Sequence, residues 1–360
     1  MELKLAFKKT IDNVQRELKK LFKKNGSKTV LLGDFSGIFY DSLDEYLTHG
    51  GKRIRPFLVQ TAFDAVGGDH SKGNIVRASL ALELLHNGSL LHDDVIDKDE
   101  TRRGKPAFYV KFRNFYQQQV NNESFDKAND FGEAMAIFAG DLCFPYAIEC
   151  IINSGFPMEA RIKALQAFAD AFREVIDGVI IETGDATLNT GTEKSYYRMV
   201  NLKTGALIRK AVEIGAILGG GSEAQRNALV TYCKEIGIAF QIQDDILGIF
   251  GDPEKLGKPI GGDIRENKQT ILRIYAMANG SSEQVNRLSE LMGSDDITEA
   301  EVEEVRKIFR DTGALAFARE KIKEATEKAI QALETAKPPL KEKPKKLFIA
   351  LAKYLEERKK

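Results

Sequence analysis

The chain has 360 residues, of which 43% are hydrophobic and 29% are charged, a composition typical of a globular protein with a substantial core. Lysine plus arginine and aspartate plus glutamate both number 53, so the overall charge gives no support to a nucleic-acid-binding role, and any electrostatic function must be local. No run approaches the roughly 18 uncharged apolar residues of a transmembrane segment.

Residues 1–25 have apolar residues at helical spacing and many lysines, without the apolar region of a signal peptide. We expect an amphipathic helix that packs one face on the domain, with contact to an anionic membrane as the alternative. The three cysteines form no CxxC pair, and their odd number fits a reducing compartment better than a disulfide scaffold. The sequence therefore predicts a cytoplasmic protein.

Helical spacing continues nearly throughout the chain, for example at Ile162, Leu165 and Phe168. No stretch alternates apolar and polar residues, and the Gly-, Pro- and Ser-containing breaks are too short for interdomain linkers. These patterns predict an all-α fold with a single domain over residues 1–360. A polar loop is expected at 114–130, and a Pro/Lys-rich bend at 336–346 before the last helix.

Two acidic clusters end apolar helical runs. In the first, steps of three or four residues from Leu82 lead to Asp93 and Asp97, with Asp94 about 100° around the helix. In the second, the stripe through Phe240 reaches Asp244, and Asp245 lies beside it. Carboxylates one turn apart repel unless a cation binds them, and Mg²⁺ binds one or two carboxylates together with substrate phosphates. The clusters therefore predict a facing pair of Mg²⁺ sites.

Basic residues accompany these clusters in several short motifs. Lys52, Arg53 and Arg55 precede a helix, and Arg102 and Arg103 follow the first acidic cluster. Three further lysines lie near the second cluster or before it: Lys203, Lys258 and Lys268. Together they predict two anion sites, one bridged by metal and one formed by Arg and Lys directly. A phosphorylated substrate fits both sites.

These motifs closely resemble those of the trans-polyprenyl diphosphate synthase family. The resemblance covers residues 45 to 275 and lies in "GGKRIRP", "HNGSLLHDDVIDKDETRRG", "AGDLC", "KTGAL", "FQIQDDILGIFGD" and "GKPIGGDIRENK". It implies an all-α bundle around a deep apolar cavity, forming a homodimer. It also implies a Mg²⁺-dependent condensation of isopentenyl diphosphate with an allylic diphosphate by ionisation, condensation and elimination.

The resemblance also implies a role for each matching residue. Two of the three Mg²⁺ ions are assigned to Asp93, Asp94 and Asp97, and the third to Asp244, with Asp245 beside it. The allylic diphosphate is assigned to Arg102, Lys203 and Lys258. Isopentenyl diphosphate is assigned to Lys52, Arg55, His86 and Arg103. Thr204 and Gln241 are assigned to the reacting carbons, and Lys268 to the phosphates.

The sequence departs from the family pattern where the second motif reads DDxxG, with Gly248 at the position of the third acid. Metal binding there would depend on Asp244 and Asp245, with Asp252 one turn further on. The polar segment 114–130 is also longer than the pattern usually shows.

Product length is set in this family by bulky residues behind the first aspartate motif. The position five residues before Asp93 is Gly88, which indicates either room for a long product or close helix packing. Candidates for the floor of the cavity are Leu84, Leu85 and Phe144. We expect a C20 to about C30 product. The alternative functions are a class I terpene cyclase and a non-catalytic synthase subunit.

Overall fold

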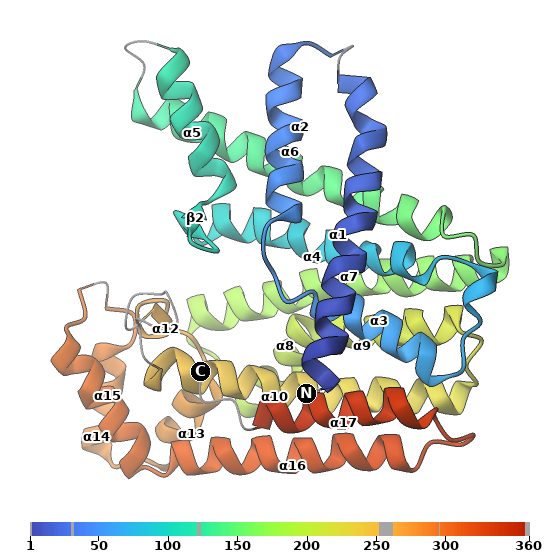
Figure 1. Cartoon of the computed structure of the whole chain (residues 1–360). Helices are drawn as coiled ribbons and strands as arrows, with labels where there is room; N and C mark the ends of the chain where they lie inside the picture. The colour runs from blue at the N-terminus through green and yellow to red at the C-terminus, as the bar shows by residue number, and fades with distance from the viewer. Residues whose placement is uncertain (1, 30–31, 121–123, 252–261, 295, 357–360) are drawn as a thin grey trace. The chain divides into compact units, whose positions relative to one another are not determined.

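The computed structural model describes residues 2–29, 32–120, 124–251, 262–294 and 296–356, which are almost entirely helical (Figure 1). Within these ranges the sole extended pairing is the short hairpin of β1 (Thr101–Arg102) and β2 (Lys105–Pro106). The prediction of an all-α fold is therefore confirmed. Contacts within the chain group into two compact units, whereas one domain was expected from the sequence.

The first unit comprises Met1–Asp64, Gly68–Phe168 and Ile214–Gly220, and the second comprises Ala65–Gly67, Ala169–Glu213 and Gly221–Lys360. Two long helices, α7 (Met158–Leu188) and α9 (Thr204–Leu218), are divided between the units, and the last residue of α3, Ala65, also belongs to the second unit. The other helices of the first unit are α1 (Glu2–Thr29), α2 (Asp34–Thr48), α3 (Ile54–Ala65), the 3₁₀ turn η1 (His70–Lys72), α4 (Ile75–Ile96), α5 (Phe108–Gln119) and α6 (Phe125–Ile152).

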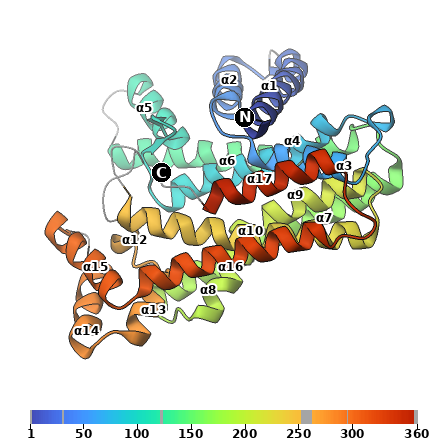
Figure 2. The same ribbon diagram turned by 60° about the horizontal axis from the view of Figure 1, so that its bottom comes forward.

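The N-terminal helix α1 lies alongside α2 in both ribbon views (Figures 1 and 2). Val14, Leu18 and Leu21 on one face of α1 are each less than 5% exposed, and α1 also contacts α4. The expected amphipathic helix with one packed face is therefore present.

Helix α4 packs closely on α6 because each presents a glycine where the backbones approach. A Cβ on Gly88 would lie 3.0 Å from the Gly140 carbonyl oxygen, and a Cβ on Gly140 would lie 3.0 Å from the Gly88 carbonyl oxygen. By length and composition α6 could also cross a membrane, although no transmembrane segment was expected from the sequence. Its small buried residues, such as Ala136 and Ala139, lie in a helix that packs against both α4 and α5. Core packing therefore accounts for much of its apolar character.

The segment expected as a polar loop at 114–130 is mostly helical. Residues 114–119 complete α5 and residues 125–130 begin α6, so among the described residues only Val120 and Ser124 lie outside a helix. The Ser124 hydroxyl accepts a hydrogen bond from the Lys127 backbone N–H and caps α6. The expectation of a loop was wrong because the polar residues of this segment lie on the outer faces of two helices.

The second unit contains most of α7 and of α9, together with α8 (Glu193–Leu202), α10 (Glu223–Phe250), α12 (Gly262–Arg265), α13 (Ile271–Asn279), α14 (Ser282–Leu291), α15 (Glu299–Asp311), α16 (Ala314–Glu334) and α17 (Glu342–Glu356). Helices α10, α16 and α17 run beside one another (Figure 2). Several N-termini carry reciprocal caps, as at Ser222 and Gln225 of α10. The bend expected at 336–346 ends where α17 begins, at Glu342.

Candidate active site

The first aspartate motif ends α4, and its carboxylates run from the core to the surface. Asp94 is 1% exposed, Asp93 is half-buried and Asp97 is exposed. Asp97 caps the helix, and its backbone N–H donates to the Asp93 carbonyl at 2.8 Å. Asp93 and Asp97 were expected to continue the buried face of this helix. Asp93 does so in part, whereas Asp97 is exposed because the helix ends there.

Asp94 forms an ion pair with Arg102, the arginine that the family resemblance assigns to the allylic diphosphate. Arg102 Nε donates to Asp94 Oδ1 at 2.6 Å, its Nη2 contacts the same oxygen, and Nη2 also lies 3.1 Å from Asp99 Oδ2. Burial raises the pKa of Asp94, although Arg102 acts in the opposite direction. The other oxygen, Oδ2, is buried and has no hydrogen-bond partner among the described residues. This arrangement suits a cation beside Asp94.

The two arginines of the "RRG" motif lie in the hairpin of β1 and β2, Arg102 at the end of β1 and Arg103 in the turn. Its two turn residues, Arg103 and Gly104, have φ values of 54° and 73°, as a tight two-residue hairpin turn requires. Both guanidinium groups line a pocket of about 470 Å³ in the first unit, together with Tyr46 and Lys105. The hairpin thus presents adjacent arginines to one pocket.

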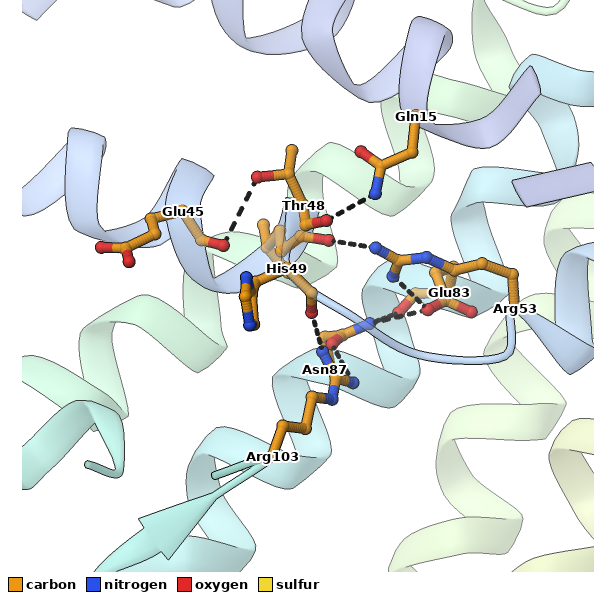
Figure 3. Close-up of polar contacts among 9 residues, drawn as sticks. Gln15, Glu45, Thr48, His49, Arg53, Glu83, Asn87 and Arg103 are labelled. Atoms are coloured by element: carbon orange, nitrogen blue, oxygen red, sulfur yellow. Dashed lines mark hydrogen bonds and ion pairs between the residues drawn. The ribbon is translucent and has the colours of Figure 1, made fainter. Parts of the chain in front are cut away.

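Arg103 binds neutral acceptors (Figure 3). Its Nη1 donates to the His49 carbonyl oxygen at 2.8 Å, and its Nη2 donates to Asn87 Oδ1 at 3.1 Å. The guanidinium also lies over the Tyr46 ring, 5.8 Å from the ring centroid. None of these three groups carries a negative charge at neutral pH, because burial raises the pKa of Tyr46 further above its usual value.

Arg53, which the sequence grouped with the anion-binding cations, is instead a buried structural residue. Its guanidinium donates to Glu83 Oε1 at 2.6 Å and to the Leu47 carbonyl at 2.7 Å, and its side chain is fully buried. Figure 3 shows that Glu83 also binds Asn87, so one chain of contacts joins Arg53 to Arg103.

Three other predicted ligands of isopentenyl diphosphate belong to the first unit: Lys52, Arg55 and His86. Lys52 is exposed, whereas Arg55 and His86 are half-buried. Burial lowers the pKa of Arg55 to about 10, and the nearby charge of Arg103 acts in the same direction. Burial and then the charges of Arg55 and Arg103 lower the pKa of His86, so the imidazole is neutral at pH 7. Arg55 and Arg103 thus place two positive charges near a neutral imidazole, and a bound anion would stabilise these charges.

In the second unit, the second aspartate motif opens on a pocket of about 410 Å³. Its lining includes six residues predicted from the sequence, Lys203, Thr204, Gln241, Asp244, Asp245 and Lys268. It also includes acidic residues that were not predicted, Glu182, Asp185 and Asp263. Lys258 and Asp252 lie outside the described residues.

Asp245, predicted as a metal ligand, has both oxygens bound within the second unit. Oδ2 accepts a hydrogen bond from the Tyr196 hydroxyl at 2.6 Å, and Oδ1 accepts one from Gln241 Nε2 at 2.9 Å. The Gln241 carbonyl in turn accepts from the Thr204 hydroxyl at 2.7 Å. Asp245 is 5% exposed, and burial raises its pKa to about 7. Its contacts are those of a residue that orients Gln241.

Gly248, the departure from the family pattern, makes room for another acid. A Cβ at this position would overlap Asp263 Oδ2 and lie 3.0 Å from Asp263 Cγ. Asp263 belongs to α12, and its Oδ1 accepts from Lys268 Nζ at 3.0 Å. A carboxylate from α12 thus lies against the position where the pattern has its third aspartate. Asp263 lies within the motif "GKPIGGDIRENK", and its place in that motif is the sequence signal that points to it.

Lys203 follows α8 and forms an ion pair with Glu182 of α7. A Cβ on Gly178 would overlap the Lys203 backbone, so α7 and the Lys203 backbone approach closely. Glu182 is a second missed residue, and no local sequence signal connects positions 21 residues apart.

The predicted chain-length residues lie in and beside the packing of α4 and α6. A Cβ on Gly88 would lie 3.0 Å from Cys143 Cβ and 3.1 Å from Phe144 Cε1, so this glycine permits close packing and opens no space of its own. Leu84 and Leu85 are each 1% exposed, and the half-buried Phe144 ring meets the His92 ring edge to face. Of the two interpretations of Gly88, the structure favours close packing.

The residues of both motifs fit Mg²⁺. Within the described residues no three potential ligands converge on one point. Mg²⁺ can bind through one or two carboxylates and complete its shell with substrate phosphates. The unpartnered Asp94 Oδ2 and the Asp263 carboxylate against Gly248 are oxygen ligands of the required kind.

Comparison with known proteins identifies the class of protein that this fold and site represent. The model of the polyprenyl synthetase family matches residues 36–309. A short chain isoprenyl diphosphate synthase of Methanothermobacter thermautotrophicus is 39% identical over 275 residues, 76% of this chain and 77% of the relative. A geranylgeranyl diphosphate synthase of Saccharolobus solfataricus is 31% identical over 92% of this chain and 91% of the relative.

Solved structures of synthases are also similar to this chain. A geranylgeranyl pyrophosphate synthase of Corynebacterium glutamicum, complexed with isoprenyl diphosphate and magnesium, is similar with a TM-score of 0.89 at 28% identity, covering 97% of this chain and 99% of that one. A geranylgeranyl pyrophosphate synthetase of Pyrococcus horikoshii gives 0.82 at 31% identity, with 99% and 100% covered. The chain therefore belongs to the polyprenyl synthetase family. It is a prenyltransferase with the all-α isoprenoid synthase fold, as the motifs predicted.

Proposed function

We propose that this prenyltransferase condenses isopentenyl diphosphate head to tail with an allylic diphosphate in a Mg²⁺-dependent reaction. The observation that carries the proposal is the group formed by the cations Arg55 and Arg103 and the neutral imidazole of His86, which lies on α4, the helix that ends in the first aspartate motif. A diphosphate would neutralise this group, and a cyclase has no need of a second diphosphate site. The complete first motif also distinguishes the chain from non-catalytic subunits, which lose such acids.

We assign Mg²⁺ to Asp93, Asp94 and Asp97 of the first motif and to Asp244 and Asp263 of the second. Asp245 is left out of this set because Tyr196 and Gln241 bind both of its oxygens. The allylic diphosphate is assigned to Arg102, Lys203 and Lys258, with Lys268 supporting the phosphates. Isopentenyl diphosphate is assigned to Lys52, Arg55, His86 and Arg103.

The reaction balances without a protein nucleophile. The allylic C–O bond breaks, and its electron pair leaves with pyrophosphate. The double bond of isopentenyl diphosphate supplies the pair for the new C–C bond, and the proton then lost passes to pyrophosphate. Bound Mg²⁺ supplies positive charge that stabilises the leaving group. Lys203 and Arg102 add to that charge, and the Thr204 hydroxyl, whose proton points to Gln241, offers lone pairs to a carbocation.

We further propose a product of C20 to about C30 and a homodimer. Relatives named geranylgeranyl and geranylfarnesyl diphosphate synthases support this length, although Gly88 itself contributes no space. For the dimer, the supporting feature is α6, on which Ile137, Phe138, Ile148 and Ile152 are each at least 40% exposed. A second copy of the chain would remove these apolar side chains from water.

The test is an assay of purified protein with Mg²⁺, labelled isopentenyl diphosphate and dimethylallyl, geranyl or farnesyl diphosphate, with products separated by length. We expect linear products of C20 or longer that disappear with EDTA and fall at least about 100-fold with Asp93→Ala. Glu159→Ala, on the exposed start of α7, is the matched control. Cyclic products or the absence of elongation with every primer would contradict the proposal. A stop at C15 would overturn the length alone.

A further inference from the structure

Two adjacent arginines, Arg102 and Arg103, bind different kinds of partner. Arg102 is paired with the carboxylates of Asp94 and Asp99. Arg103 is held by the His49 carbonyl oxygen, by the Asn87 amide oxygen and by the ring of Tyr46. The positive charge of Arg103 is therefore fixed in place by hydrogen bonds that do not neutralise it.

The orientation of the Asn87 amide is determined by Glu83. Asn87 Nδ2 donates to the Glu83 carbonyl oxygen at 2.7 Å and to Glu83 Oε1 at 3.2 Å. Because both of these partners only accept hydrogen bonds, the nitrogen must face Glu83, and Oδ1 must face Arg103. Asn87 is fully buried, so water does not compete for either end of the amide. The amide thus points one acceptor at Arg103.

The carboxylate of Glu83 lies next to this amide and also forms an ion pair with Arg53. The Arg53 Nη1 to Glu83 Oε1 distance is 2.6 Å, and both side chains are at least 95% buried. Glu83 therefore orients Asn87 while its charge is balanced by Arg53. The contacts form a chain in the order Arg53, Glu83, Asn87 and Arg103, which Figure 3 shows.

We propose that Asn87 is a positioning residue that holds the Arg103 guanidinium, with its charge available, for the diphosphate of isopentenyl diphosphate. The inference rests on the proposed role of Arg103. A neutral amide suits this task because an acid at position 87 would pair with Arg103 and would repel Glu83. The proposal explains why a fully buried polar residue occurs in the middle of α4, where an apolar residue would otherwise pack.

The test is a double-mutant cycle on the full chain with Asn87→Ala, Arg103→Ala and both together. For each variant, kcat, the KM of isopentenyl diphosphate and the KM of the allylic diphosphate are measured, together with the unfolding temperature. We expect Asn87→Ala to raise the KM of isopentenyl diphosphate about tenfold, with the allylic KM within about twofold, because a displaced guanidinium loses its binding geometry. The double variant should be no worse than Arg103→Ala.

Ser79→Ala is the control, since Ser79 is equally buried on α4 and hydrogen-bonds the Val76 carbonyl and Gln60. It should leave both KM values unchanged. If Asn87→Ala does not fold, Asn87→Ser replaces it, because serine keeps a polar group but is too short to reach Arg103.

The outcomes separate the two proposals. If Arg103→Ala leaves the KM of isopentenyl diphosphate unchanged, the proposed role of Arg103 fails. If Arg103→Ala raises this KM and Asn87→Ala does not, the positioning role of Asn87 is wrong. The positioning role of Asn87 would also be wrong if Asn87→Ala raised both KM values equally. It would be wrong, too, if the effects of the two substitutions added fully in the double variant.

Discussion

A carboxylate oxygen of Asp263 occupies the space that a Cβ at position 248 would need. The glycine and the aspartate are therefore complementary: the first removes a side chain from α10, and the second fills the vacated place from α12. Gly248→Ala should displace the Asp263 carboxylate and raise the Mg²⁺ concentration for half-maximal activity by about tenfold, because a metal ligand is moved. The measurement is a Mg²⁺ titration of the rate.

Gly184→Ala is the control for this substitution. A Cβ on Gly184 meets nothing within 4 Å, and the residue lies within α7, so alanine should leave the Mg²⁺ dependence unchanged. Equal Mg²⁺ dependence of the Gly248→Ala variant and the unmodified protein would show that Asp263 is not needed for metal binding.

The close approach of α4 and α6 makes Gly88 a stability residue. A Cβ there would lie 3.0 Å from both Cys143 Cβ and the Gly140 carbonyl oxygen, and these neighbours belong to a helix packed along its length. Gly88→Ala should therefore lower the free energy of unfolding by about 1–3 kcal/mol through overpacking. Urea unfolding measures this change, and the product length should stay the same. A shorter product at unchanged stability would instead assign Gly88 to the wall of the substrate cavity.

Breaking the buried ion pair of Arg53 and Glu83 should lower the free energy of unfolding far more than breaking an ion pair on the surface. Glu83→Gln leaves the fully buried guanidinium without its countercharge, which typically costs about 3–5 kcal/mol. For comparison, Lys163→Met breaks an exposed pair with Glu159 and should cost less than about 0.5 kcal/mol. Chemical unfolding of both variants tests the contrast, and similar small losses would argue against a structural role for Arg53.

Stability in acid should depend on Glu45. Hydrogen bonds from Lys105 and Lys111 lower its pKa from 4.5 to about 2. Because the folded pKa lies below the unfolded one, the ionised group stabilises the fold above about pH 4.5, and this contribution is lost as the pH falls towards 2. The carboxylate is half exposed, so Glu45→Gln should cost at most about 1 kcal/mol at pH 7.

Unfolding curves at pH 7 and pH 3, each at low and high salt, test this prediction. The difference between Glu45→Gln and the unmodified protein should shrink in acid and in 1 M salt, since screening weakens exposed pairs. A difference that grows as the pH falls would mean that the two lysines do not stabilise the ionised form.

The periodicity and the motifs predicted the helical fold, the family and the elements that carry the site. They could not distinguish neighbouring acids. Asp244 and Asp245 are 100° apart on a helix, and the structure shows that Tyr196 and Gln241 bind the two oxygens of Asp245. Asn87 was missed because its partner Arg103 is 16 residues away along the chain and is brought close by the hairpin. Contacts between elements, which spacing does not encode, account for these differences.

The left-handed backbone at Arg103, with a φ of 54°, bears on the design of heat-resistant variants. A residue with a side chain in this conformation stores about 1–2 kcal/mol that glycine would not, and asparagine tolerates it better than arginine. A search that ranks substitutions by melting temperature alone would therefore favour replacing this arginine, and would remove the charge proposed to bind the substrate. Heat-resistant variants of this enzyme are best selected by turnover after heating, so that position 103 stays occupied by arginine.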